Sequence, residues 1–64
     1  MQQNFIIDGD VYTAKIWKER GVYVAECPEL GTSSSGKTIK SARLNLKEAT
    51  RLFLEGGSKG KEKV

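Results

Sequence analysis

Residues 11–27 read VYTAKIWKERGVYVAEC, and this stretch decides the fold. Its two ends, residues 11–17 and 22–27, are rich in the β-branched and aromatic residues that favour strands. The four residues between them end in Gly21, where a type I turn followed by a left-handed residue would close a hairpin. We therefore expect two antiparallel strands at the centre of a small sheet.

Further elements flank this hairpin on both sides. Upstream, Asp8-Gly9 separates an apolar run from the first strand, which predicts a short N-terminal edge strand at residues 4–7. Downstream, Pro28 ends the second strand because proline has no amide donor, and the polar residues 32–35 can pair as a short further strand.

An amphipathic helix follows from about residue 39 to residue 55, with Thr38 at its N-cap and Gly56-Gly57 as its predicted end. Its core-facing stripe is predicted to be Ile39, Ala42, Leu46, Ala49 and Phe53. The fold class is therefore α+β, an antiparallel β-β-β-α unit over residues 1–55 with an extra N-terminal edge strand. Residues 56–64 are basic and glycine-rich, and we expect a disordered tail there because they offer too little apolar surface to offset their ordering entropy.

One helix can cover only one face of such a sheet. We assign Ala14, Ile16, Tyr23, Ala25, Cys27 and Leu30 to the covered face. The other face would carry an exposed apolar patch made of Val11, Trp17, Val22 and Val24. A patch of this kind marks an interface, so we expect a homodimer or higher oligomer through the sheet. The alternative is that a bent sheet or the N-terminal strand covers these residues.

Charge divides the 64 residues into two parts. Residues 1–36 hold three basic and five acidic side chains, whereas residues 37–55 hold five basic and two acidic ones. The outward helix face carries a basic stripe of Lys40, Arg43, Lys47 and Arg51, accompanied by Leu44 and Leu54. This stripe could bind an acidic partner or a phosphate backbone, or it could be a solvated face that aids solubility.

Residues 31–38, GTSSSGKT, match the P-loop pattern at every fixed position. A nucleotide-hydrolysing P-loop protein also needs a parallel sheet with a magnesium-binding Asp on a later strand, and the antiparallel pattern here contradicts it. A weak anion site at the helix N-terminus, with Lys37, is an alternative to a plain polar loop. The chain has no His, and its single Cys27 reads as a core residue, so we expect no enzyme, cofactor or metal site.

The single cysteine and the uncharged N-terminus favour a cytoplasmic protein, and no apolar run approaches the ~20 residues of a membrane span. Residues 23–31 (YVAECPELG), 36–38 (GKT), 45–49 (NLKEA) and 52–55 (LFLE) together resemble the N-terminal domain of HicB-like antitoxins. The resemblance spans roughly residues 11–55. It implies a truncated ribonuclease H-like fold without that enzyme's metal-binding carboxylates.

The resemblance also implies a function. In antitoxins of this kind the domain covers a small RNA-cleaving toxin. We therefore expect a stand-alone, non-catalytic binding protein, either an antitoxin or an orphan relative of one. The alternative is a small nucleic-acid-binding protein that uses the basic helix face and the tail, with weak and nonspecific binding.

Overall fold

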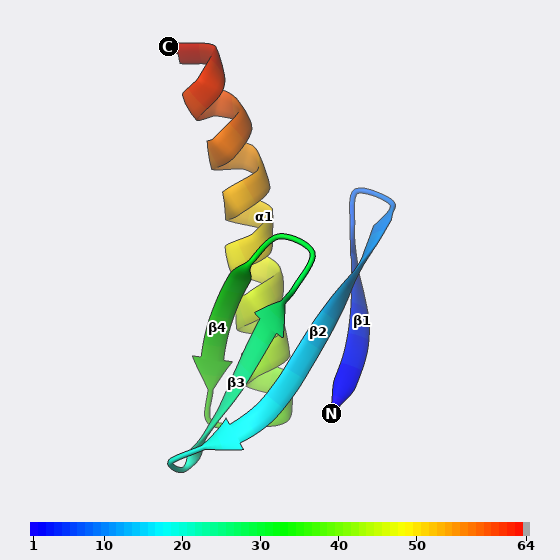
Figure 1. Ribbon diagram of the computed structural model, residues 1–64, viewed down its shortest axis with the longest axis vertical. Helices are drawn as coiled ribbons and strands as arrows, with labels where there is room; N and C mark the ends of the chain where they lie inside the picture. The colour runs from blue at the N-terminus through cyan, green and yellow to red at the C-terminus, as the bar shows by residue number, and fades with distance from the viewer. Residues whose placement is uncertain (64) are drawn as a thin grey trace.

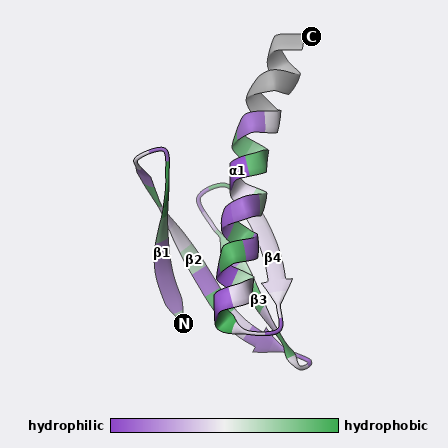
Figure 2. Cartoon of the chain, turned by 180° about the vertical axis from the view of Figure 1, so that it is seen from behind, coloured by the Kyte–Doolittle hydropathy of each residue, from purple (hydrophilic) through white to green (hydrophobic). Residues whose placement is uncertain are grey.

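The computed structural model describes the backbone of residues 1–63 and the side chains of residues 1–56. Four strands precede one helix: β1 (Gln2–Ile7), β2 (Asp10–Glu19), β3 (Val22–Cys27), β4 (Thr32–Gly36) and α1 (Ile39–Lys63). Each strand pairs antiparallel with its neighbour in sequence, and α1 lies over one face of the sheet (Figures 1 and 2). The predicted α+β fold, with its extra N-terminal strand, is confirmed. No helix in the described part of the chain is long and apolar enough to cross a membrane.

Two-residue turns close the first two hairpins. Residues 8–9 and residues 20–21 all have positive φ angles, between 51° and 85°, which defines type I′ turns. The type I turn expected in the second hairpin is therefore wrong. Glu19 pairs directly with Val22, so only two residues remain for the turn, and the type I′ twist matches that of the flanking strands.

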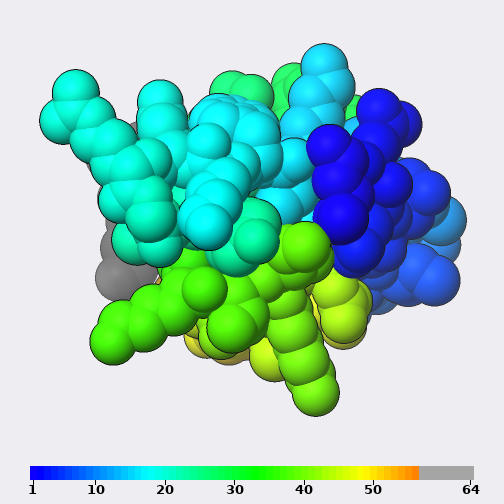
Figure 3. Space-filling model, turned by 90° about the horizontal axis from the view of Figure 1, so that it is seen from below, coloured from blue at the N-terminus to red at the C-terminus, as the bar shows by residue number. Residues whose placement is uncertain are grey.

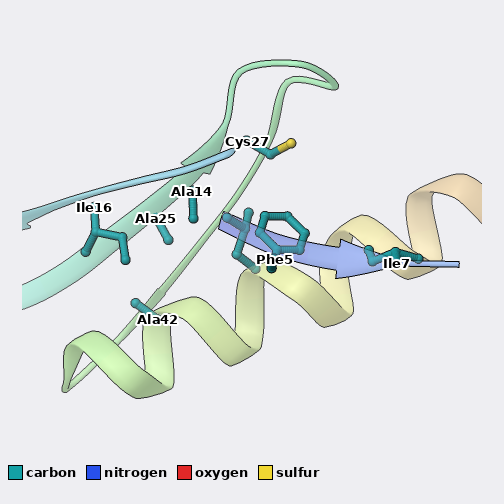
Figure 4. Close-up of a cluster of buried hydrophobic side chains, with 8 residues drawn as sticks. Phe5, Ile7, Ala14, Ile16, Ala25, Cys27 and Ala42 are labelled. Carbon is teal, nitrogen blue, oxygen red and sulfur yellow. The ribbon is translucent and has the colours of Figure 1, made fainter. Parts of the chain in front are cut away.

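The core lies between the sheet and α1. Figure 4 shows strand side chains pointing into this space, with Ala42 of the helix opposite them. Its buried members are Phe5, Ile7, Ala14, Ile16, Ala25, Cys27, Ala42 and Leu46. Alanines at the centre let the helix come close to the strands. Cys27 is a core residue as predicted, and burial raises the pKa of its thiol.

The helix begins where the sequence predicts and ends later. The backbone amide of Ser41 donates to Thr38 Oγ1 at 3.0 Å, which confirms Thr38 as the N-cap. The predicted end near residue 55 is wrong, because α1 continues to Lys63. Gly56 does not adopt the left-handed conformation that would terminate the helix. The sequence predicts disorder for residues 56–64. The structure describes Gly56 but not the side chains of residues 57–64, so this disorder stays a prediction.

On α1, the C-terminal half of the stripe that faces the core differs from the predicted one. Phe53 is 50% exposed, whereas Leu54, expected on the outward face, packs against the core. Figure 1 shows α1 extending past the ends of β3 and β4. The buried positions on α1 follow a spacing of four, from Ala42 through Leu46 and Thr50 to Leu54, and this stripe passes to one side of Phe53. Thr50 is fully buried instead, and its hydroxyl shares a 2.8 Å hydrogen bond with that of Thr32 on β4.

Contacts between α1 and β4 fix the position of the helix. A Cβ added at Gly36 would lie 2.6 Å from the backbone nitrogen of Ala42, so no larger residue fits without movement. Asn45 Nδ2 donates to the backbone carbonyl of Ser35 at 2.7 Å. The helix therefore provides a hydrogen-bond partner for a backbone group at the outer edge of β4.

Candidate binding surface

The face of the sheet that α1 leaves bare carries an apolar group at one end. Trp17 of β2 lies opposite Val24 of β3, and Val22 lies next to them beside the β2–β3 turn. Trp17 is 41% exposed and Val22 39% exposed, while Val24 is half-buried. We call these three residues the Trp17 cluster.

Val11, the fourth residue of the predicted patch, lies elsewhere on the same face. It pairs with Ile6 of β1, and these side chains are 60% and 57% exposed. Six positions along β2 separate Val11 from Trp17, which is about 20 Å at 3.3–3.4 Å per residue. The structure therefore has two apolar groups where one patch was predicted. Since β1 pairs beside β2, the N-terminal strand does not cover either group.

A polar band separates the two groups. Lys15 lies opposite Glu26 at the centre of the face. Beyond the end of β3, Glu29 accepts hydrogen bonds from the backbone amide of Thr13 at 3.1 Å and from its hydroxyl at 2.8 Å. The Cys27 thiol donates to the same carboxylate at 3.4 Å. The bonds from Thr13 hold the pKa of Glu29 below its ordinary value.

The Glu29 carboxylate therefore satisfies a β2 amide at the point where β3 has turned away. Glu29 is exposed to solvent, and its carboxylate also has this defined hydrogen-bonding role. No local signal reveals this role, because it depends on how the loop after Cys27 folds back toward β2.

The predicted basic face is interrupted in the structure. It consists of Lys40, Arg43, Lys47 and Arg51. Lys40 and Lys47 are exposed, but Arg51 forms ion pairs with Glu48 at 2.6 Å and Glu55 at 3.0 Å, which raise the pKa of its guanidinium. The stripe therefore offers less positive charge to a ligand than a count of its basic residues indicates.

The P-loop match falls mostly on a strand. Residues 32–36 form β4 and pair with β3, so their backbone is extended and does not wrap around a phosphate group. Within the described residues, no group of three or more His, Cys, Asp or Glu side chains is placed to hold a metal ion. The expectation that the chain does not hydrolyse nucleotide stays a prediction.

These features define a small α+β domain in which a helix covers one sheet face and the other face offers an apolar cluster with a polar surround. The UPF0150 protein Ta0767 of Thermoplasma acidophilum is 46% identical over 55 residues, which cover 83% of this chain and 80% of that protein. The chain therefore belongs to the UPF0150 family. No family model matches it, and no solved structure matches it.

Proposed function

We propose that this UPF0150 protein is a non-catalytic binding protein, a HicB-like antitoxin or an orphan relative, that neutralises a small RNA-cleaving toxin. The observation that carries the proposal is the Trp17 cluster on the bare face of the sheet. The resemblance of residues 23–31 and 45–49 to HicB-like domains supplies the kind of partner. A protein that inhibits RNA cleavage acts in the cytoplasm, where the RNA substrate of the toxin is.

The Trp17 cluster has the composition of an interface centre. Tryptophan is enriched among the residues that dominate binding energy, and such residues are usually surrounded by a polar rim. Here Glu19 lies opposite Val22, and Glu26 lies opposite Lys15 beside the cluster. An apolar centre with carboxylates around it suits a partner that is apolar in the middle and basic outside.

Charge favours the sheet over the helix as the toxin-binding side. Proteins that bind RNA present basic surfaces to the phosphate backbone. The sheet-forming residues 1–36 hold more acidic than basic side chains, whereas residues 37–55 hold more basic ones. A basic toxin is therefore attracted to the sheet and repelled by the exposed lysines of α1.

Co-expression tests this proposal. The gene's neighbourhood is searched for a small basic reading frame, which is expressed in a bacterial host with and without this protein, and growth, RNA integrity and co-purification are measured. We expect the neighbouring product to arrest growth and cleave RNA when alone, and to be inactive and co-purified when both are present.

A pair of variants tests the surface. Trp17→Ala is expected to weaken toxin binding by about tenfold or more, as for a central aromatic contact. Leu44→Ala removes a half-exposed apolar side chain from α1 and should leave binding unchanged. Failure of the neighbouring product to bind, or equal binding by wild type and Trp17→Ala, would overturn the proposal.

A further inference from the structure

The two edges of the sheet differ in how they are protected. At the β4 edge, Asn45 bonds to the carbonyl of Ser35, and Gly36 lies against the first turn of α1. At the β1 edge, no described residue of the chain lies beyond the strand in Figure 1, and Figure 3 shows the first residues, in blue, along one flank of the molecule.

Strand β1 also lacks the features by which edge strands usually avoid pairing. Such strands carry charged side chains, proline or a bulge. Residues 2–7, QQNFII, have neither charge nor proline, and their pairing with β2 continues without a bulge from Gln2 to Ile7. An edge of this kind is a template for another strand.

The hydrogen bonds at Met1 show which backbone groups face outward. The amide of Ile16 donates to the carbonyl of Met1 at 2.7 Å, and the amine of Met1 donates to the carbonyl of Ile16 at 2.9 Å. In an antiparallel pair such bonded positions alternate with unbonded ones. The amides and carbonyls of Gln2, Asn4 and Ile6 therefore point away from β2, toward the open edge.

We propose that two copies of this chain associate through β1 in antiparallel register, joining their sheets into one continuous sheet of eight strands. A two-fold axis at Asn4 sets each Asn4 opposite its counterpart and each Gln2 opposite the partner's Ile6. This is the register in which all the outward groups of the strand find partners. A second copy fits because β1 is uncharged, so two identical strands meet without repulsion.

This arrangement keeps both helices on the same side of the joined sheet. It also leaves the Trp17 cluster of each copy exposed, so it is independent of the proposed toxin binding. It places the predicted self-association at a sheet edge, whereas the sequence alone predicts it at the bare face. Ile6, which is 57% exposed in one chain, would lie beside the partner's strand.

Sedimentation equilibrium at micromolar concentration tests the proposal. The wild type should have twice the 7.1 kDa mass of one chain. Asn4→Pro removes an outward amide that β2 does not use, so it should raise the dimer dissociation constant by about tenfold or more. Asn4→Ala retains the amide and should remain a dimer, and Trp17→Ala should remain one as well.

A charge swap keeps the test decisive if the proline variant folds poorly. Because Asn4 faces its own counterpart, Asn4→Asp and Asn4→Lys should each be monomeric, and an equimolar mixture should form a heterodimer. A monomeric wild type, a dimer in Asn4→Pro, or a dimer lost in Trp17→Ala would each overturn β1 pairing. Binding of an unrelated strand to a monomeric wild type would overturn the choice of a second copy.

Discussion

The two faces of the sheet differ in the side chains that they carry. The face under α1 carries Ala14 and Ala25 at its centre, both fully buried, whereas the bare face carries Trp17 and Val24 at one end. A helix can approach closely only where the strands carry small side chains, so packing within the chain constrains the covered face. The size of the bare-face residues is not constrained in this way, so large apolar side chains such as Trp17 can stand partly exposed there.

Substitution at the centre of the covered face should have the largest effect on stability. Leu46 is fully buried, and Leu46→Ala should lower the free energy of unfolding by about 2–5 kcal/mol in urea denaturation. Leu44→Ala, on the solvent side of the same helix, should change it by only about 0.5 kcal/mol. Similar losses in the two variants would contradict the assignment of helix faces.

The next largest effect should come from the contact between β4 and α1. Gly36→Ala would place a methyl group against the backbone of Ala42, and we expect a loss of about 1–3 kcal/mol. Gly56→Ala is the matched control, since nothing lies within 4 Å of its added Cβ, and helix propensity predicts a gain of about 0.5–1 kcal/mol. The melting temperatures of the two variants should therefore shift in opposite directions from that of the wild type.

A smaller, pH-dependent effect should come from Glu29 on the bare side. Because its folded pKa lies below the ordinary value of 4.5, its contribution to stability is present above about pH 4.5 and is lost as pH falls through the folded pKa. Melting temperatures of Glu29→Gln should therefore change less with pH in this acidic range than those of the wild type. Glu19→Gln is the control on β2, and an equal flattening there would argue against a special role for Glu29.

The smallest effect should be seen in nucleic-acid binding by the basic face. We expect at most weak, sequence-independent binding whose affinity falls by orders of magnitude between roughly 50 and 200 mM salt. Lys47→Ala should reduce the salt dependence by about one counterion, whereas Arg51→Ala should change it less because Glu48 and Glu55 already pair with that side chain. Tight binding to a defined sequence at physiological salt would support the alternative function.

The strands, the hairpins and the start of the helix were predictable because their signals are local. Gly9 and Gly21 mark turns, and Thr38 marks a helix start, through backbone geometry that involves only a few neighbouring residues. The alternation along β2 and β3 also assigned side chains to the correct faces. The type I′ geometry at Arg20 was missed because arginine seldom adopts a positive φ.

Features that depend on how residues far apart in the sequence lie in space were not predictable in this way. Periodicity placed Phe53 in the core stripe, but it could not show that the buried stripe continues at a spacing of four, through Thr50 to Leu54. Face assignment grouped Val11 with Trp17, but it ignored their separation along β2. The Thr32–Thr50 and Thr13–Glu29 contacts join residues 16 to 18 positions apart, and neither is visible from local sequence.

The order of the strands has a consequence for how fast the chain folds. Every strand pairs with its neighbour in sequence, and two of the connections are turns of only two residues. The entropy lost on closing each loop is therefore small, and topologies dominated by such short-range contacts fold rapidly. We expect refolding in about a millisecond, with the two hairpins forming first and α1 docking onto them afterwards.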